Sequence, residues 1–255
     1  MKELFKLWDQ TKMITLIAIS AGLYAALLIP FKMFQIIPGF AELRPAACIP
    51  IVCSLFFGPS AAWGASIGNL VADFAGQFGP GSFFGLIGNF LYAYLPYRIW
   101  RKYKRTTSKK IVTKKDYAIL FLIVIVSSGV CASSISYGLN LIGLPFSSVA
   151  WIIFINNSVS GIILVPLLCN WLDNRVYAWH LNYEEIIPTD KFSSQKLTTL
   201  FLLLLIIITI SSFAIGYLPL ISKFLKNLQK YNYLSTDPII SILFIVLLFI
   251  LSLLI

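Results

Sequence analysis

The chain has 255 residues, of which 58% are hydrophobic and only 12% are charged. A soluble domain carries about 25% charged residues, so the composition excludes a soluble protein and predicts an all-α polytopic membrane protein. The formal net charge is +10. Because the basic residues cluster beside apolar runs, this charge is typical of membrane topology rather than of nucleic-acid binding.

Eight apolar runs follow one another along the chain and predict eight membrane spans. Gly58 and Pro59 separate the second run from the third and predict a tight turn, because proline fixes φ and glycine allows unusual φ. The second run is short, and loops at 32–42, 76–82 and 140–147 connect other spans. The expected spans are residues 11–31, 43–57, 60–76, 83–100, 117–139, 148–172, 197–219 and 238–255.

The distribution of Lys and Arg predicts the orientation of the spans. Segment 98–115 holds nine Lys and Arg residues, so we place it in the cytoplasm. Alternating the spans from there gives fifteen basic residues inside and five outside, with both termini inside. Three of the five lie at 223–230, where a re-entrant or interfacial helix is an alternative. Residues 1–12 are short and mixed in charge, so we expect no cleavable signal.

Residues suited to catalysis or metal binding are scarce. The four cysteines lie in apolar runs without CxxC or Cys/His spacing, which indicates small core residues. His180 is the only imidazole and cannot hold a metal ion alone. The chain has no GxSxG motif and no phosphate-cradling Gly-Lys-Ser/Thr loop. We therefore expect no enzyme activity, no metal and no cofactor.

The third expected span carries an amide and a carboxylate on a face of small residues. Asn69 and Asp73 are four residues apart and share one helix face. A carboxylate inside a membrane is costly unless it is paired, so it indicates function by default. The alternatives are that Asp73 lies at the outer interface, or that it pairs with Arg44 as a structural lock.

Polar side chains recur in the fourth and sixth expected spans. Asn89 and Tyr92 share a face of the fourth span and could hydrogen-bond a ligand or bridge helices. Asn156 and Asn157 are adjacent and point about 100° apart on a helix, so we expect only one of them to face a cavity. In the predicted orientation the outer face receives the span ends that carry Arg44, Asp73, Gln77, Tyr137, Asn140, Trp151 and Asn156.

The last two expected spans differ from the others because they contain few small or polar residues. A helix that is apolar on all sides is typical of a lipid-exposed position. We therefore divide the chain into a six-span core at 1–172, a cytoplasmic polar segment at 173–196 and two additional spans at 197–255.

Residues 55–76, LFFGPSAAWGASIGNLVADFAG, resemble a Gly- and Ala-rich stretch of the substrate-binding S components of energy-coupling factor (ECF) vitamin transporters. The resemblance covers roughly residues 10–172, and the two spans after 172 depart from the six-helix family fold. Ala21 and Ala25, in a small-xxx-small pattern, match the position of the family's AxxxA motif, which docks on the transmembrane T component. Packing inside the chain is the alternative for these two alanines.

The resemblance implies a high-affinity binder of a vitamin or related micronutrient in a prokaryotic plasma membrane, working with a T component and two cytoplasmic ATPases. In the family, outer loops and the outer parts of later spans hold the solute. The expected substrate-binding residues are Gln35, Glu42, Arg44, Asn69, Asp73, Asn89, Tyr92, Asn140, Trp151, Asn156 and Asn157, with residues 76–81 as an outer gate.

Two other functions remain open from the sequence. The first is a stand-alone secondary carrier of a small solute, in which Asp73 would couple transport to an ion gradient. The second is a membrane enzyme or scaffold acting on lipids, which would need a catalytic group that the sequence does not offer.

Overall fold

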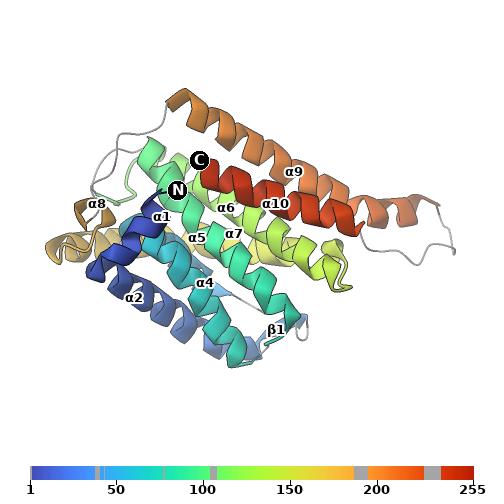
Figure 1. Ribbon diagram of the computed structural model, residues 1–255, viewed down its shortest axis with the longest axis horizontal. Coiled ribbons are helices and arrows are strands. Elements are labelled where there is room, and N and C mark those ends of the chain that lie inside the picture. Colours follow the sequence, from blue (N-terminus) through green and yellow to red (C-terminus); the bar gives the residue numbers. More distant parts are fainter. Residues whose placement is uncertain are drawn as a thin grey trace.

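The computed structural model describes residues 2–37, 41–42, 44–76, 78–103, 108–186, 195–226 and 237–255. They form a bundle of helices that lie roughly side by side (Figure 1). Among these residues the principal helices are α2 (Thr11–Leu28), α3 (Cys48–Phe57), α4 (Pro59–Phe74), α5 (Pro80–Tyr103), α6 (Lys114–Leu141), α7 (Phe146–Ala178), α9 (Gln195–Lys226) and α10 (Pro238–Leu254). Each coincides closely with one expected span.

Among the residues that the structure describes, four helical segments are long and apolar enough to cross a membrane. They are Thr11–Met33, Lys114–Leu141, Phe146–Ile186 and Leu197–Pro219, while Pro45–Phe57 and Pro238–Leu254 are apolar but shorter. The protein is therefore a helical membrane protein. The division into six core spans and two added spans stays a prediction.

A tight turn at Gly58 lets α3 and α4 follow each other directly. Gly58 has a positive φ of 56°, and Pro59 starts α4, where a missing N–H costs nothing. A Cβ at Gly58 would also lie 2.5 Å from the ring of Tyr183. The predicted turn is confirmed, and α4 then packs between α2 and α5, with α6 on the far side of α5.

The loop predicted at 32–42 contains a small antiparallel hairpin. A 3-10 segment (Ile29–Met33) extends α2, and β1 (Gln35–Ile37) then pairs with β2 (Ala41–Glu42). A second 3-10 turn (Pro45–Ala47) leads into α3. Figure 1 shows β1 at the end of the bundle away from the N- and C-termini.

The opposite end of the bundle is held together by ion pairs between distant segments. In α1 (Lys2–Lys6), Glu3 Oε1 lies 2.8 Å from Arg101 of α5. Lys109 Nζ lies 3.0 Å from Glu184 in α8 (Tyr183–Ile186). The N-terminus, segment 108–115 and residues 173–186 therefore lie at the same end, as the alternating topology requires. The short helices α1 and α8 were not predicted.

The two C-terminal helices pack on α6 through polar as well as apolar contacts. Ser133 of α6 lies 2.7 Å from the hydroxyl of Ser212 of α9, and Tyr137 donates to the carbonyl of Ser212. Much of α9 remains exposed, with only 22% of its most apolar window buried. The prediction of a lipid-facing pair of helices thus holds for their outer sides, while their inner sides belong to the bundle.

Candidate functional site

A buried ion pair joins the end of the first span to α4. Lys32 Nζ lies 2.6 Å from Asp73 Oδ1, and each residue is only 6% exposed. Asn69, one turn earlier on the same face, donates its amide to Asp73 Oδ2 at 3.0 Å. The carboxylate therefore has a charge partner and a hydrogen bond, which is what burial of a charge requires. The structure gives Asp73 the partner Lys32 and not Arg44, which was one of the two alternatives for this carboxylate.

Close packing of α5 on α4 brings this group against a second polar pair. A Cβ at Gly85 would lie 2.9 Å from Asn69 Nδ2, so only glycine lets α5 approach the amide this closely. Asn89, one turn after Gly85, donates to the Gly85 carbonyl at 2.8 Å and accepts from the Tyr24 hydroxyl at 2.9 Å. Side chains from α2, α4 and α5 thus form one buried polar group.

One acceptor in this group is not used. Asn69 Oδ1 is buried, and no described residue donates a hydrogen bond to it. A buried amide oxygen without a donor costs about 1–3 kcal/mol. The group can therefore accept one further hydrogen bond beside the Lys32–Asp73 pair.

A second polar group lies around Tyr92 in the centre of the bundle. The Tyr92 hydroxyl donates to the Ala47 carbonyl at 3.0 Å and approaches the Asn157 carbonyl at 3.4 Å. Ser160 of α7 donates to the Pro45 carbonyl at 2.6 Å. These bonds hold the 3-10 turn that leads into α3 between α5 and α7.

Three of the expected site residues lie near Cys131 in α6. The Asn157 side chain lies beside the thiol, and Arg44 is close enough to interact with it electrostatically. The Tyr92 hydroxyl also lies near Cys131. A cation, an amide, a phenol and a thiol therefore lie in one region of the bundle. We call Arg44, Tyr92, Cys131 and Asn157 the central cluster.

A comparison with protein-family models identifies the chain. The model of the QueT transporter family matches residues 14–174. The chain belongs to the QueT transporter family. This family comprises S components of ECF-type transporters, so the resemblance at residues 55–76 is confirmed. The protein is a membrane transport component for a small micronutrient and not an enzyme. Searches of curated proteins and of solved structures gave no significant match.

The QueT-family match ends inside α7, so α9 and α10 lie outside it. Two expected site residues point toward these helices. Asn140 donates to the Ser241 hydroxyl of α10 at 2.9 Å, and Trp151 packs against Phe213 of α9 with ring centroids 5.3 Å apart.

The structure describes some of the remaining expected site residues and leaves others outside the described ranges. Asn157 is buried, whereas Asn156 is half-buried, as expected if one of the two faces the interior. Gln35 and Glu42 are opposite each other in the hairpin backbone. Residues 38–40 and 43 of the loop, and Gln77 of the proposed gate, lie outside the described residues.

The two alanines of α2 that were expected to dock a partner face the inside of the bundle. Ala21 and Ala25 are 8% and 5% exposed, and α4 packs so closely here that a Cβ at Gly68 would lie 2.7 Å from the Ala21 carbonyl. These two alanines serve packing inside the chain, which was the alternative. A different row, Ala18, Gly22 and Ala26, lies on the exposed face of α2. A Cβ at Gly22 would meet nothing within 4 Å.

Sequence reasoning missed Lys32 and Cys131. The sequence analysis placed Lys32 in a loop. Its position directly after the first apolar run was the only signal that it lies at the membrane boundary. Cys131 was read as a small core residue, which its burial supports. No sequence signal distinguishes it from the other three buried cysteines.

Proposed function

We propose that this chain is the S component that captures a queuosine precursor for an ECF transporter. The observation that carries the proposal is the QueT-family match, because that family serves queuosine precursors. These precursors are small planar deazaguanine bases whose edges carry several hydrogen-bond donors and acceptors. Polar side chains inside an apolar bundle suit such a ligand.

The proposed binding site is the central cluster, with the hairpin above it. Arg44 and the Asn157 amide would hydrogen-bond the edge of the base, and the Tyr92 ring would border it. The Asn69–Asp73–Lys32 group would form the adjoining wall, with Asn69 Oδ1 as an acceptor. Gln35, Glu42 and Asn156 remain proposed contacts, and residues 76–81 remain the proposed gate.

In this proposal a T component docks on α2 and two ATPases energise release to the cytoplasm. Helix α2 suits this role because it has two working faces. Its exposed row of Ala18, Gly22 and Ala26 lets another helix approach closely. On its inner face, Tyr24 bonds Asn89, and Lys32 follows to bond Asp73. Movement of α2 against a T component would therefore reach the wall of the site directly.

The orientation completes the proposal. Both termini would lie in the cytoplasm of a prokaryote, with the hairpin outside. An ion-coupled secondary carrier is less well supported, because Asp73, the carboxylate it would use, is neutralised by Lys32.

The test has two parts. Purified protein in detergent is titrated with queuosine-precursor bases and, for comparison, with guanine. We expect saturable binding of the precursors. In proteoliposomes that contain the chain with a T component and ATPases, we expect uptake only with internal ATP. Uptake by the chain alone under an ion gradient would support the carrier instead.

A further inference from the structure

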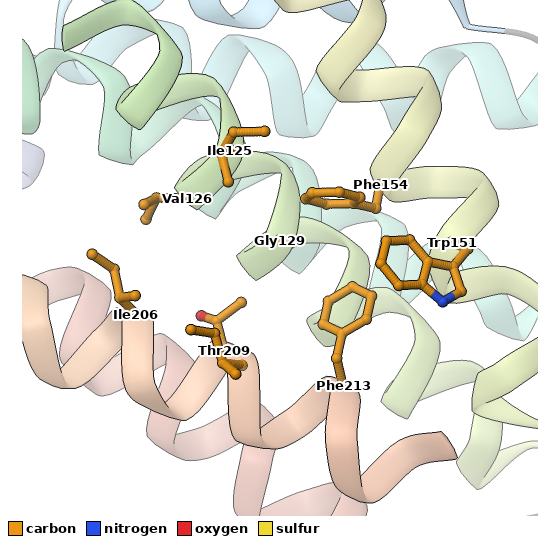
Figure 2. A pocket seen from close by; sticks show the side chains of 9 residues that line it. Ile125, Val126, Gly129, Trp151, Phe154, Ile206, Thr209 and Phe213 are labelled. Atoms are coloured by element: carbon orange, nitrogen blue, oxygen red, sulfur yellow. The ribbon is translucent and has the colours of Figure 1, made fainter. Parts of the chain in front are cut away.

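An apolar groove of about 290 Å³ lies between the QueT-family core and the added helix α9. Helix α6 supplies its floor, and α7 and α9 supply its two sides (Figure 2). At roughly 150 Å³ an apolar cavity already accepts a ring the size of benzene, so this groove can hold a larger hydrocarbon. Its lining consists of Ile125, Val126, Gly129, Trp151, Phe154, Ile206, Thr209, Ile210 and Phe213.

The groove lies at membrane depth and offers almost nothing to a polar ligand. All its lining residues belong to segments apolar enough to cross a membrane. The hydroxyl of Thr209 is already bonded to the Leu205 carbonyl at 2.7 Å. A deazaguanine base would lose most of its hydrogen bonds with water there, because the only polar side-chain groups in the lining are the Thr209 hydroxyl and the Trp151 indole N–H, and this loss costs several kcal/mol. The groove is therefore not a second substrate site.

The shape of the groove follows from how α9 meets the core. Gly129 lets α9 come close to α6, since a Cβ at Gly129 would lie 2.8 Å from Thr209 Cγ2. The rings of Trp151, Phe154 and Phe213 close the end nearer the hairpin, with centroids 5.3–5.8 Å apart. From Phe213 down to Ile206 the groove extends about 10 Å along α9 at 1.5 Å per residue. It is elongated, and its side is open where Ile210 is exposed.

We propose that this groove holds the acyl chain of a membrane phospholipid, which joins α9 to the core. The argument is that the groove opens sideways within the apolar part of the bundle, where the surrounding medium consists of acyl chains. Water would find too few hydrogen-bond partners among these side chains. If the groove were empty, the side chains on both walls would lose dispersion contacts.

The test uses the wild-type chain in nanodiscs of phosphatidylglycerol that include the same lipid with a diazirine in its acyl chain. After irradiation, labelled positions are mapped by mass spectrometry. Val126 and Gly129 form the floor and are shielded from the bulk bilayer, so label at residues 125–129 requires a chain inside the groove. We expect label there as well as on outward positions of α9 such as Ile207. Label confined to outward positions overturns the proposal.

Two adjacent variants supply a matched pair. Ile206→Trp fills the groove, whereas Ile207→Trp places the same ring on the exposed face of α9, where Ile207 is 58% exposed. We expect Ile206→Trp to remove the label at 125–129 and Ile207→Trp to leave it. Equal labelling in both variants contradicts the proposal. So does loss of the wild-type label on adding a queuosine-precursor base, or on forming a complex with a second copy or a T component, because each would identify a different occupant.

Discussion

Lys32 and Asp73 form an ion pair in which both charges are almost removed from solvent. The desolvation of such a pair offsets much of its attraction, so the pair adds little net stability. Removing one partner is different, because it leaves the other charge buried and alone. The pair therefore fixes the end of α2 against α4 more than it stabilises the fold.

Replacing Lys32 with Met should lower the free energy of unfolding by about 3–5 kcal/mol, because Asp73 is left unpaired. The double variant Lys32→Met/Asp73→Leu should recover most of this loss. Thermal unfolding in detergent measures both. Lys12→Met is the control, since Lys12 is exposed at the start of the same helix, and its effect should be near zero. A single variant as stable as the control would refute the role of the pair.

Gly85 is expected to be intolerant of even one methyl group. In Gly85→Ala the new Cβ would meet Asn69 Nδ2, so Asn69 must move or α5 must retreat. Overpacking of this kind costs about 1–3 kcal/mol, and ligand affinity should fall with it. Gly79→Ala is the control, because a Cβ there meets nothing within 4 Å. Equal unfolding temperatures and equal ligand affinities for the two variants would contradict the packing described for Asn69.

At the scale of elements, the polar seam between α6 and the C-terminal helices has a measurable strength. Asn140 donates to Ser241 across it, and hydrogen bonds between membrane helices contribute about 0.6 kcal/mol on average. A double-mutant cycle with Asn140→Ala and Ser241→Ala should give a coupling energy of this order. Additive effects of the two substitutions would show that the bond does not hold α10.

Substitutions on the two faces of α2 should affect different functions, docking on the exposed face and folding on the inner face. Gly22→Trp adds bulk to the exposed row without a clash inside the chain, so it should abolish uptake by the reconstituted transporter and preserve substrate affinity. Ala21→Trp and Ala25→Trp should instead disturb the fold, because both alanines pack against α4. Ile207→Trp on α9 is the control and should leave uptake intact. Uptake by Gly22→Trp at the wild-type rate would exclude this face as the docking surface.

The elements could be predicted from the sequence more fully than their contacts. Apolar run lengths and Gly58-Pro59 located every principal helix, with ends that differ by up to seven residues, because membrane spans demand continuous apolar sequence. The hairpin at 35–42 was missed since its strands are too short to show alternation. The sequence could not predict that Asn140 faces α10. Periodicity shows which residues share one face of a helix, but it does not show which other helix packs against that face.

The same limit applies to the site. The spacing of Asn69 and Asp73 placed them correctly on one face of α4. The sequence also predicted that only one of Asn156 and Asn157 faces the interior, but it did not show which one. Lys32 as the partner of Asp73 depends on where the ends of two helices meet, which local sequence does not encode. The sequence offered Ala21 and Ala25 for docking, whereas the structure buries both against α4 and exposes the neighbouring row of Ala18, Gly22 and Ala26.

At the scale of the whole molecule, the bundle has two unlike flanks and two unlike ends. Figure 1 shows α2 on the flank opposite α9. One flank therefore carries the exposed small-residue row, and the other carries the helices outside the QueT-family match. One end is tied by ion pairs of Glu3 and Lys109, and the other carries the hairpin above the central cluster. This polarity suits a subunit that binds solute at one end and a partner along one side.

The central claim is that a queuosine precursor binds at the central cluster, and two asparagines test it most directly. Asn157 belongs to that cluster, whereas Asn140 bonds to α10. In calorimetric titrations of folded protein with a queuosine-precursor base, Asn157→Ala should weaken binding about tenfold or more, as loss of one buried hydrogen bond implies. Asn140→Ala should retain the wild-type affinity. Unchanged affinity in Asn157→Ala, or an equal loss in both variants, would contradict the account.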